Sequence, residues 1–338
     1  MTNIVLFGGA SDERHVSVAS AQNVARALGS PAPLCWFWTP EGAVHDVALA
    51  ELLAHQRPFE IDFHSSRPAI WPTLEQALDT LPVDEPLFVL ALHGGAGEDG
   101  TVQRMMEQRG IPFTGSGSEA SAAAFDKGRA KEMVKNKLRT AESRVVRDPR
   151  DLAAVARAML ERHERLVLKP VAGGSSRGLF FVGRGDAIPE TSVPYIVEQF
   201  LAGRELTVGV IDAGDGPVAL PVIEIETDPG FTFDYAGKYL GHGTREICPA
   251  RIPDALRDAA QRAAVVAHDA LGCDSYSRTD LIATGGDEVF FLELNTLPGL
   301  TTSSLVPQEL KEVGIGFRQF LERQIELARG RIAHVAGA

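Results

Sequence analysis

The chain has 338 residues, 44% of them hydrophobic and 23% charged, which is ordinary for a soluble globular protein with room for two or three domains. Its formal net charge of −12 argues against a protein whose affinity comes from the phosphate backbone of nucleic acid. Residues 1–30 show no signal peptide, and no run of about 18 apolar residues indicates a membrane span. Cys35, Cys248 and Cys273 support neither a disulfide framework nor a zinc site. We therefore expect a cytoplasmic enzyme with no nucleic-acid or membrane partner.

Strand and helix signals alternate along the first third of the chain. The expected elements are strands at 4–7, 34–38 and 87–92 and helices at 16–28 and 101–108. Such alternation indicates a parallel sheet that helices cover on both faces. The Gly/Ser stretch at 114–117 is the expected end of this parallel α/β domain, which we place at 1–117.

A change of composition near Phe125 marks a second unit, an α+β domain expected at 118–197. Its elements are expected to be helices at 126–138 and 151–163 and strands at 165–169, 179–183 and 194–198. A third domain is expected at 198–338. Its elements are expected to be strands at 205–211 and 218–226, a loop at 228–246, a helix at 254–271 and a hairpin at 276–295.

The hairpin at 276–295 is the strongest candidate for a metal site. Pairing Ala283 with Glu288 across its turn would put four polar side chains on one face, namely Arg278, Asp280, Glu293 and Asn295. The same pairing would put four apolar side chains on the other face, namely Leu281, Phe290, Leu292 and Leu294. Neighbouring carboxylates repel unless a cation lies between them, and oxygen ligands suit a hard ion such as Mg²⁺. A solvated strand face with an incidental Arg–carboxylate pair is the alternative.

Residues 95–100 match the pattern G-x-G-x-x-G between a strand and a helix, which suggests a dinucleotide fold. Two features count against that interpretation. Glu98 and Asp99 would put negative charge where a pyrophosphate must lie, and the strand is the third expected one instead of the first. No P-loop pattern occurs in the chain.

Three other loops are candidates for binding. Residues 173–178 follow Lys169 and are typical of a lid over phosphates, or else of a hairpin turn beside a surface lysine. The loop at 8–15 lies at the carboxyl edge of the expected sheet with His93, so Glu13 is either a ligand group or a helix-capping charge. The loop at 231–248 is rich in aromatic residues and glycine, which favours a functional, omega-like lid over disorder.

Taken in order, these motifs resemble the D-alanine–D-alanine ligases of the ATP-grasp fold from residue 4 to about 306. The motifs that carry the resemblance are Gly8-Gly9 with Glu13, His93-Gly94 with 97–100, 114–117 with Asp126-Lys127, Lys169-Pro170 with 174–178, Asp234-Tyr235 with Lys238-Tyr239, Arg278 with Asp280, and Glu293 with Asn295, Pro298-Gly299 and Ser304-Leu305. The resemblance implies three domains, with ATP held between the central and C-terminal ones. It also implies ligation of two D-alanines through a D-alanyl phosphate, for peptidoglycan precursors.

The resemblance also implies roles for residues that bind ATP and metal. Asp280 and Glu293 would hold one Mg²⁺, and Glu293 with Asn295 a second, with Mn²⁺ as a substitute. The residues implied in ATP binding are Lys127, Lys169 and Lys238 at the phosphates, Ser176 in the lid, Glu198 and Leu201 at adenine, and Glu205 at the ribose.

Further roles are implied for residues near the two substrates. Glu13 would bind the ammonium group of the first D-alanine near His93, and Ser175 and Tyr239 would close the loop over the site. Arg278 and the N–H of Gly299 would stabilise the tetrahedral intermediate. Ser304 and Leu305 would bind the carboxylate of the second D-alanine.

The sequence departs from the family pattern at a few positions and leaves some alternatives open. Gln199 stands where lysine is usual, His15 where an acidic residue is common, and Ala236 is small for its loop. A ligase of other D-amino acids and a nucleotide-binding regulator remain alternatives. Dimers are common in the family, so a homodimer is an open expectation.

Overall fold

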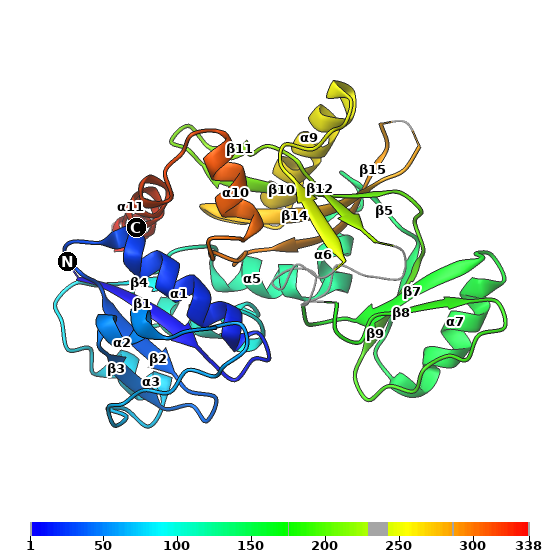
Figure 1. Cartoon of the computed structure of the whole chain (residues 1–338). Coiled ribbons are helices and arrows are strands. Elements are labelled where there is room, and N and C mark those ends of the chain that lie inside the picture. The colour runs from blue at the N-terminus through cyan, green and yellow to red at the C-terminus, as the bar shows by residue number, and fades with distance from the viewer. Residues whose placement is uncertain (1, 175, 229–242, 286, 337–338) are drawn as a thin grey trace.

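The computed structural model describes residues 2–174, 176–228, 243–285 and 287–336, with side chains as far as Arg331. Three sheets organise the described chain, one at the N-terminal end and two beyond it (Figure 1). No helix among the described residues is long and apolar enough to cross a lipid bilayer.

The N-terminal sheet has the spatial order β3-β2-β1-β4, in which β1 runs parallel to β2 and β4 while β3 is antiparallel to β2. Its strands are β1 (Thr2–Gly8), β2 (Leu34–Trp38), β3 (Val44–Val47) and β4 (Pro86–Leu90). The accompanying helices are α1 (Arg14–Leu28), α2 (Leu49–Ala54), α3 (Leu74–Asp79) and α4 (Thr101–Glu107). The expected strands and helices are confirmed, but β3 was not predicted because its four residues carry two polar side chains.

A separate core lies against an antiparallel sheet of order β6-β9-β7-β8. Its strands are β6 (Ser143–Val146), β7 (Arg165–Pro170), β8 (Phe180–Gly183) and β9 (Tyr195–Gln199). Helix α7 (Leu152–Leu160) buries Leu152, Ala156 and Met159 against β7 and β9. The expected helix at 151–163 and the three expected strands of this unit are confirmed, with the helix shorter at its end.

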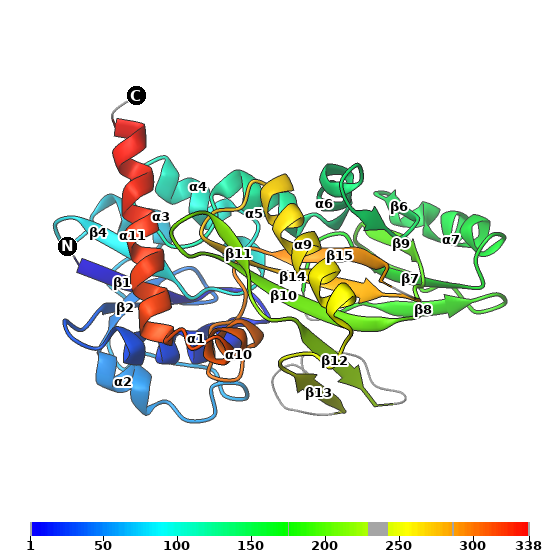
Figure 2. The ribbon, with the colours of Figure 1, turned by 90° about the horizontal axis from the view of Figure 1, so that it is seen from above.

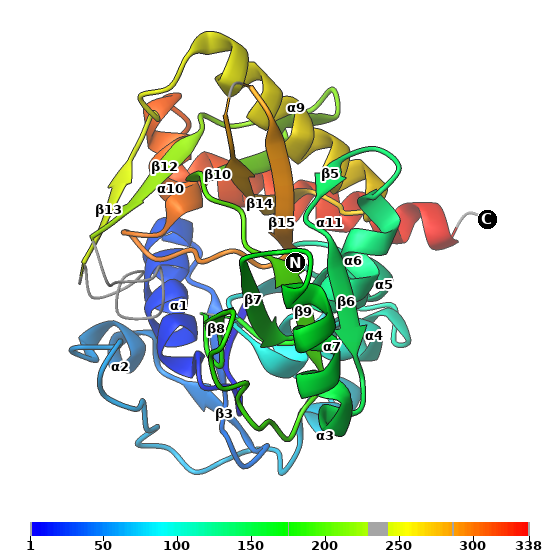
Figure 3. The ribbon, with the colours of Figure 1, turned by 90° about the vertical axis from the view of Figure 1, so that its right-hand side faces the viewer.

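The large sheet has the order β13-β12-β10-β14-β15-β5, with β11 paired to β10. Its strands are β5 (Arg139–Thr140), β10 (Arg204–Asp212), β11 (Pro217–Ala219), β12 (Ile223–Thr227), β13 (Thr244–Ile247), β14 (Tyr276–Ala283) and β15 (Val289–Asn295). The strand expected at 218–226 is wrong as one element, because Pro221 lies between β11 and β12 and has no N–H for a ladder. In Figures 1 and 3 the small antiparallel sheet lies below β14 and β15 of this sheet.

Helices pack on the large sheet from several parts of the chain. They are α5 (Ser118–Phe125), α6 (Lys127–Val134), α9 (Asp254–Ala270) and α10 (Leu305–Glu312). The helix expected at 126–138 begins close to the predicted position, where the Asp126 side chain accepts from the N–H of Arg129 as the N-cap, but it already ends at Val134. The expected helix at 254–271 is confirmed, and Gly272 follows it with a φ of 67°.

The β14–β15 pairing differs from the expected register. Ala283 lies opposite Val289, and an irregularity after Asp280 then brings Asp280 opposite Glu293 and Arg278 opposite Asn295. The grouping of those four polar residues is confirmed, whereas the grouping of Phe290 and Leu292 with Leu281 is wrong. A bulge adds one residue to one strand, so the alternation of faces shifts along it. Phe291 therefore lies opposite Leu281, 1% exposed in the core.

Three helices pack on elements that are distant from them in the sequence. Helix α11 (Phe317–Ala336) packs on α1 and β4, and it runs along the N-terminal sheet in Figure 2. Helices α5 and α6 pack on β15, and their alanines share a core with Phe291. The domain boundaries at 117 and 197 stay predictions.

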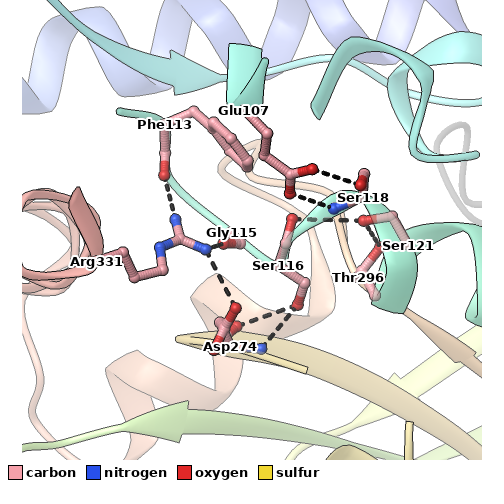
Figure 4. A network of polar contacts seen from close by, with 9 residues as sticks. All are labelled: Glu107, Phe113, Gly115, Ser116, Ser118, Ser121, Asp274, Thr296 and Arg331. Carbon is pink, nitrogen blue, oxygen red and sulfur yellow. Dashed lines mark hydrogen bonds and ion pairs between the residues drawn. The ribbon is translucent and has the colours of Figure 1, made fainter. Parts of the chain in front are cut away.

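Arg331 of α11 ties these parts together at the segment that leaves the N-terminal sheet (Figure 4). Its guanidinium donates to the carbonyl oxygens of Phe113 and Gly115, the latter at 2.6 Å, and lies 3.3 Å from the carboxylate of Asp274. The Ser116 Oγ accepts from the N–H of Asp274 at 3.0 Å. One arginine thus joins the C-terminal helix, the 113–118 segment and the start of β14.

We expect Arg331→Ala to lower the free energy of unfolding by about 1.5–3 kcal/mol, because it removes charged hydrogen bonds to two backbone carbonyls. Urea unfolding followed by circular dichroism measures this change. Arg329→Ala, at an exposed position of the same helix, is the matched control and should stay within about 0.5 kcal/mol of the parent. Equal values for the two variants would contradict the contribution of this cluster.

Candidate active site

A cavity of about 860 Å³ lies between the small antiparallel sheet and the large sheet. It brings together eight of the residues singled out from the sequence, namely Lys127, Lys169, Ser176, Glu198, Leu201, Glu205, Asp280 and Glu293. These residues come from α6, β7, the loop after β7, β9, the loop after β9, β10, β14 and β15. Residues far apart in the sequence therefore line one site.

A buried carboxylate between two lysines forms one wall of this cavity. Lys169 Nζ lies 2.8 Å from one oxygen of Glu198, and Lys131 Nζ lies 2.6 Å from the other as an ion pair without well-aligned hydrogen-bond geometry. Glu198 is 3% exposed. Burial alone would raise its pKa, but the two lysines outweigh burial and the pKa of Glu198 is lowered. Attraction between the Glu198 carboxylate and the two lysine ammonium groups thus holds this wall of the cavity together.

The pKa values of the two lysines in this cluster shift in opposite directions. Burial lowers the pKa of Lys131 in spite of the Glu198 charge. For Lys169, the opposing effects of Glu198 and Glu293 exceed that of burial, so its pKa is raised. Lys131 was not singled out from the sequence, although its spacing of four from Lys127 in a helix already places both on one face.

Lys127 connects the glycine-rich loop to the hairpin. Its Nζ donates to the carbonyl oxygen of Gly173 at 2.6 Å and lies 3.3 Å from Glu293 Oε2. The ammonium group therefore sits where the loop after β7 approaches β15. A phosphate at this point would meet a positive charge already held in place by two partners.

The carboxylates of the hairpin face the same cavity and are each paired with other groups. Asp280 accepts from Arg278 through both oxygens, at 2.9 and 2.7 Å, and from Thr207 Oγ1 at 2.6 Å. Asn295 Oδ1 accepts from the N–H of Leu297 at 2.9 Å. A smaller hollow beside the cavity is lined by Asn295 together with Glu293 and Lys127. Within the described ranges, no group of three or more His, Cys, Asp or Glu side chains is placed to hold a metal ion.

The opposite end of the cavity is apolar and aromatic. The Arg165 guanidinium lies over the rings of Phe181 and Phe200, at 4.8 and 4.6 Å from their centroids. Leu201 and Leu292 line the same end. A flat ring could stack here while an attached anionic chain reaches the lysines. Phe181 and Phe200 were missed because an aromatic residue in a strand or just after one usually indicates core.

Glu13 lies where the first loop meets the glycine-rich loop. A Cβ atom on Gly94 or on Gly174 would come within 2.9 Å of its Oε2, so a larger residue at either position would displace the carboxylate. The Arg177 guanidinium lies 2.5 Å from the Asp12 carboxylate and joins the same two loops. Ser175, Lys238 and Tyr239 lie outside the described residues.

His93 is buried beside α1, with Nε2 at 3.1 Å from Ser20 Oγ and Nδ1 at 3.5 Å from Glu98. Ser20 Oγ also accepts from the N–H of Leu300 at 3.3 Å. Asn23, one turn further along α1, donates to the Leu300 carbonyl oxygen at 2.8 Å. Helix α1 thus holds both His93 and the loop that contains Gly299.

Ser304 occupies the N-cap position of α10, but its Oγ accepts from the N–H of Thr301 at 3.2 Å and makes no capping hydrogen bond to the helix. Leu305 and Gly299 are buried beside it. These residues, like Glu13, His93 and Arg278, are not among those that line the main cavity. The two sets of residues meet at Gly174 with Glu13 and at Asp280 with Arg278.

Comparison with known proteins gives a consistent result across the chain. Residues 2–116 match the family model described as D-ala D-ala ligase N-terminus, and residues 153–326 match the D-ala D-ala ligase C-terminus. The D-alanine–D-alanine ligase of Syntrophobacter fumaroxidans is 38% identical, over 97% of both chains. That of Geobacter sulfurreducens is 36% identical, over 94% of this chain and 91% of its own.

Solved structures agree with this assignment. The VanG D-Ala:D-Ser ligase of Enterococcus faecalis superposes with a TM-score of 0.81 at 30% identity, covering 97% of this chain and 99% of its own. The D-alanine–D-alanine ligase of Coxiella burnetii reaches 0.80 over 100% and 96% of the two chains, at 22% identity that supports the fold alone. The expected ATP-grasp fold is confirmed. The chain belongs to the D-alanine–D-alanine ligase family.

Proposed function

We propose that the protein joins two D-alanine molecules into D-alanyl-D-alanine at the expense of ATP, for the synthesis of peptidoglycan precursors. The observation that carries the proposal is the cavity between the two sheets, where Lys169 and Glu293 line one space, in a chain 38% identical to a ligase of that name over 97% of its length. ATP would lie in this cavity, between the proposed central and C-terminal domains at 118–197 and 198–338. Its adenine would stack near Phe200 and Leu201, and its ribose would meet Glu205.

The phosphates would lie toward the lysines. Lys127 and Lys169 would neutralise phosphate oxygens, with Lys238 added from the loop outside the described residues. Ser176 and the backbone of the glycine-rich loop would cover the phosphates as a lid. The Lys131–Glu198–Lys169 cluster supports this orientation, because its positive charge is held in place before the ligand binds.

Asp280, Glu293 and Asn295 fit Mg²⁺ by the chemistry of their donors, which are all oxygen atoms. Asp280 and Glu293 lie directly opposite each other on neighbouring strands and line the same cavity. They would hold Mg²⁺, or Mn²⁺ in its place, with Asn295 beside Glu293. Bound there, the metal would neutralise charge on the phosphate oxygens during transfer.

The first half of the reaction would use the loops around Glu13. Glu13 would bind the ammonium group of the first D-alanine, with His93 nearby. A carboxylate oxygen of this substrate would attack the γ-phosphorus of ATP, forming a new O–P bond while the bond to ADP breaks. Ser175 and Tyr239 would complete the closed loop and exclude water from the D-alanyl phosphate.

The second half would use the residues around α10. Ser304 and Leu305 would bind the carboxylate of the second D-alanine, whose neutral amino nitrogen attacks the acyl carbon. Arg278 and the N–H of Gly299 would stabilise the oxyanion that forms. The C–N bond forms, phosphate leaves, and a proton is lost from the nitrogen.

A different acceptor is a second candidate, because the VanG structure that this chain resembles is described as a D-Ala:D-Ser ligase. In that case the residues for ATP and the first D-alanine keep their roles. The change would concern only the acceptor. The loop at 229–242 and α10 would then decide the specificity.

The purified protein with ATP, Mg²⁺ and D-alanine should release ADP and phosphate and form D-alanyl-D-alanine. EDTA should stop turnover, and added Mg²⁺ should restore it. Coupled ADP release and chromatography of the product measure both. D-serine and D-lactate at equal concentrations with limiting D-alanine identify the acceptor. No nucleotide turnover with any of these acids would overturn the proposal.

Glu293→Gln should reduce kcat strongly while ATP binding weakens less, because the amide removes the charge that would hold the metal. Lys127 would also lose its partner at 3.3 Å. Steady-state kinetics and calorimetric titration with ATP separate the two effects. Glu288→Gln, on the same hairpin but at an exposed position, is the control. Near-normal rates of the Glu293 variant in saturating Mg²⁺ would refute the metal assignment.

Arg278→Ala should lower kcat by about 10²–10³ if the guanidinium stabilises the oxyanion. The variant also leaves the buried Asp280 without its two-point partner, so thermal melting must show that the fold persists. Arg278→Lys keeps the charge and serves as the comparison. A change confined to KM would exclude the proposed role.

A further inference from the structure

Glu309 is a fully buried acid on α10 that the proposed reaction leaves without a role. Its side chain is 0% exposed. Oε1 accepts from the N–H of Gly209 at 2.7 Å, while Oε2 has no hydrogen-bond partner among the residues that the structure describes. An apolar side chain could pack this helix on the sheet without the cost of burying a carboxyl group.

The carboxyl group lies on the part of the sheet that carries the reactive residues. A Cβ atom on Gly209 would come within 2.4 Å of Glu309 Oε2, so the glycine makes room for the acid. Gly209 lies directly opposite Arg278, and Thr207 opposite Asp280. Residues opposite each other on antiparallel strands point to the same face. Glu309 is therefore on the face that bears Arg278 and Asp280.

The electrostatic surroundings agree with this placement. Burial raises the pKa of Glu309 well above its usual range, opposed by the N–H of Gly209 and the Arg278 charge, while Asp280 adds to the rise. A neutral carboxyl group keeps its Oε1 as an acceptor for Gly209. Its link to β10 therefore does not depend on a negative charge.

We propose that Glu309 is a positioning residue that sets α10 on β10 and so holds the acceptor subsite at a fixed distance from Arg278. Leu305 lies four residues earlier on the helix, so both face the sheet side of α10, and Ser304 precedes it at the N-cap position. The inference rests on the proposed function, since it assigns the acceptor carboxylate to Ser304 and Leu305. Glu309 itself does not touch a substrate.

Hydroxylamine separates this role from the rest of the reaction. Its nitrogen attacks the acyl carbon of D-alanyl phosphate, a C–N bond forms, phosphate leaves, and a proton is lost to give the hydroxamate. It has no carboxylate and therefore does not use the subsite on α10. Dipeptide formation from D-alanine is compared with hydroxamate formation at D-alanine concentrations below the second-site KM. The proteins are the parent, Glu309→Ala, Glu309→Gln and the exposed control Glu312→Ala.

Glu309→Ala should lower kcat/KM for the second D-alanine by about tenfold or more, because a misplaced subsite loses alignment for attack. Hydroxamate formation should change by less than about twofold. Glu309→Gln should stay near the parent, because its amide oxygen still accepts from Gly209. Glu312→Ala should leave both activities unchanged.

Equal loss of both activities in Glu309→Ala, or loss of neither, would overturn the inference in favour of a purely structural role. If that variant does not fold, Gly209→Ala decides, because its methyl group displaces the Glu309 carboxyl from β10. If Gly209→Ala loses dipeptide formation but keeps hydroxamate formation, the inference is supported. If it loses both activities equally, or neither, the inference is overturned. The parent protein shows whether the proposed function itself fails, since it would then form neither product.

Discussion

The pairing of β14 with β15 is the constraint on which the site depends. Near the turn Leu281 lies opposite Phe291, and beyond the irregularity Asp280 lies opposite Glu293. Without the extra residue, Asp280 would lie opposite Leu292, and the two carboxylates would not face each other. The bulge therefore lets Phe291 keep its place in the core near the turn while the acidic pair beyond it faces the cavity.

Three acidic side chains around the cavity are each paired with basic side chains. Asp280 is held by Arg278, Glu293 by Lys127, and Glu198 by Lys131 with Lys169. Burying Asp280 or Glu198 without a partner would cost several kcal/mol, so these pairs support folding. They are also the groups that a nucleotide and a divalent cation would need. The same pairing that supports folding of the site keeps its lysines oriented for phosphate.

Much of the fold and of the site follows from local sequence signals. The parallel strands of the N-terminal sheet and the hairpin carry clear apolar and turn patterns. The expected pairing of Ala283 with Glu288 placed Asp280 and Glu293 on one face, which the structure reaches by a different pairing and a bulge. The bulge could not be predicted, because it arises from packing Phe291 against α5, α6 and α9. Lys131, Phe181 and Glu309 were missed for a related reason. The role of each of these residues depends on contacts with segments far away in the sequence, such as the contact of Glu309 with Gly209.

Helix α1 relates the two halves of the proposed reaction. Ser20 contacts His93, which is proposed to lie near the first substrate, and also the N–H of Leu300 in the loop next to the acceptor subsite. Asn23, on the same side of the helix, holds the carbonyl oxygen of Leu300. Attack on an acyl phosphate needs reacting atoms about 3–3.5 Å apart, a spacing that independently mobile loops would not keep. Ser20 and Asn23, about one helical turn apart, fix His93 and the loop that contains Leu300 to one rigid helix. In the proposed reaction, α1 and α10 would set the distance between the two substrates, and the groups that contact the acceptor's side chain would decide its identity.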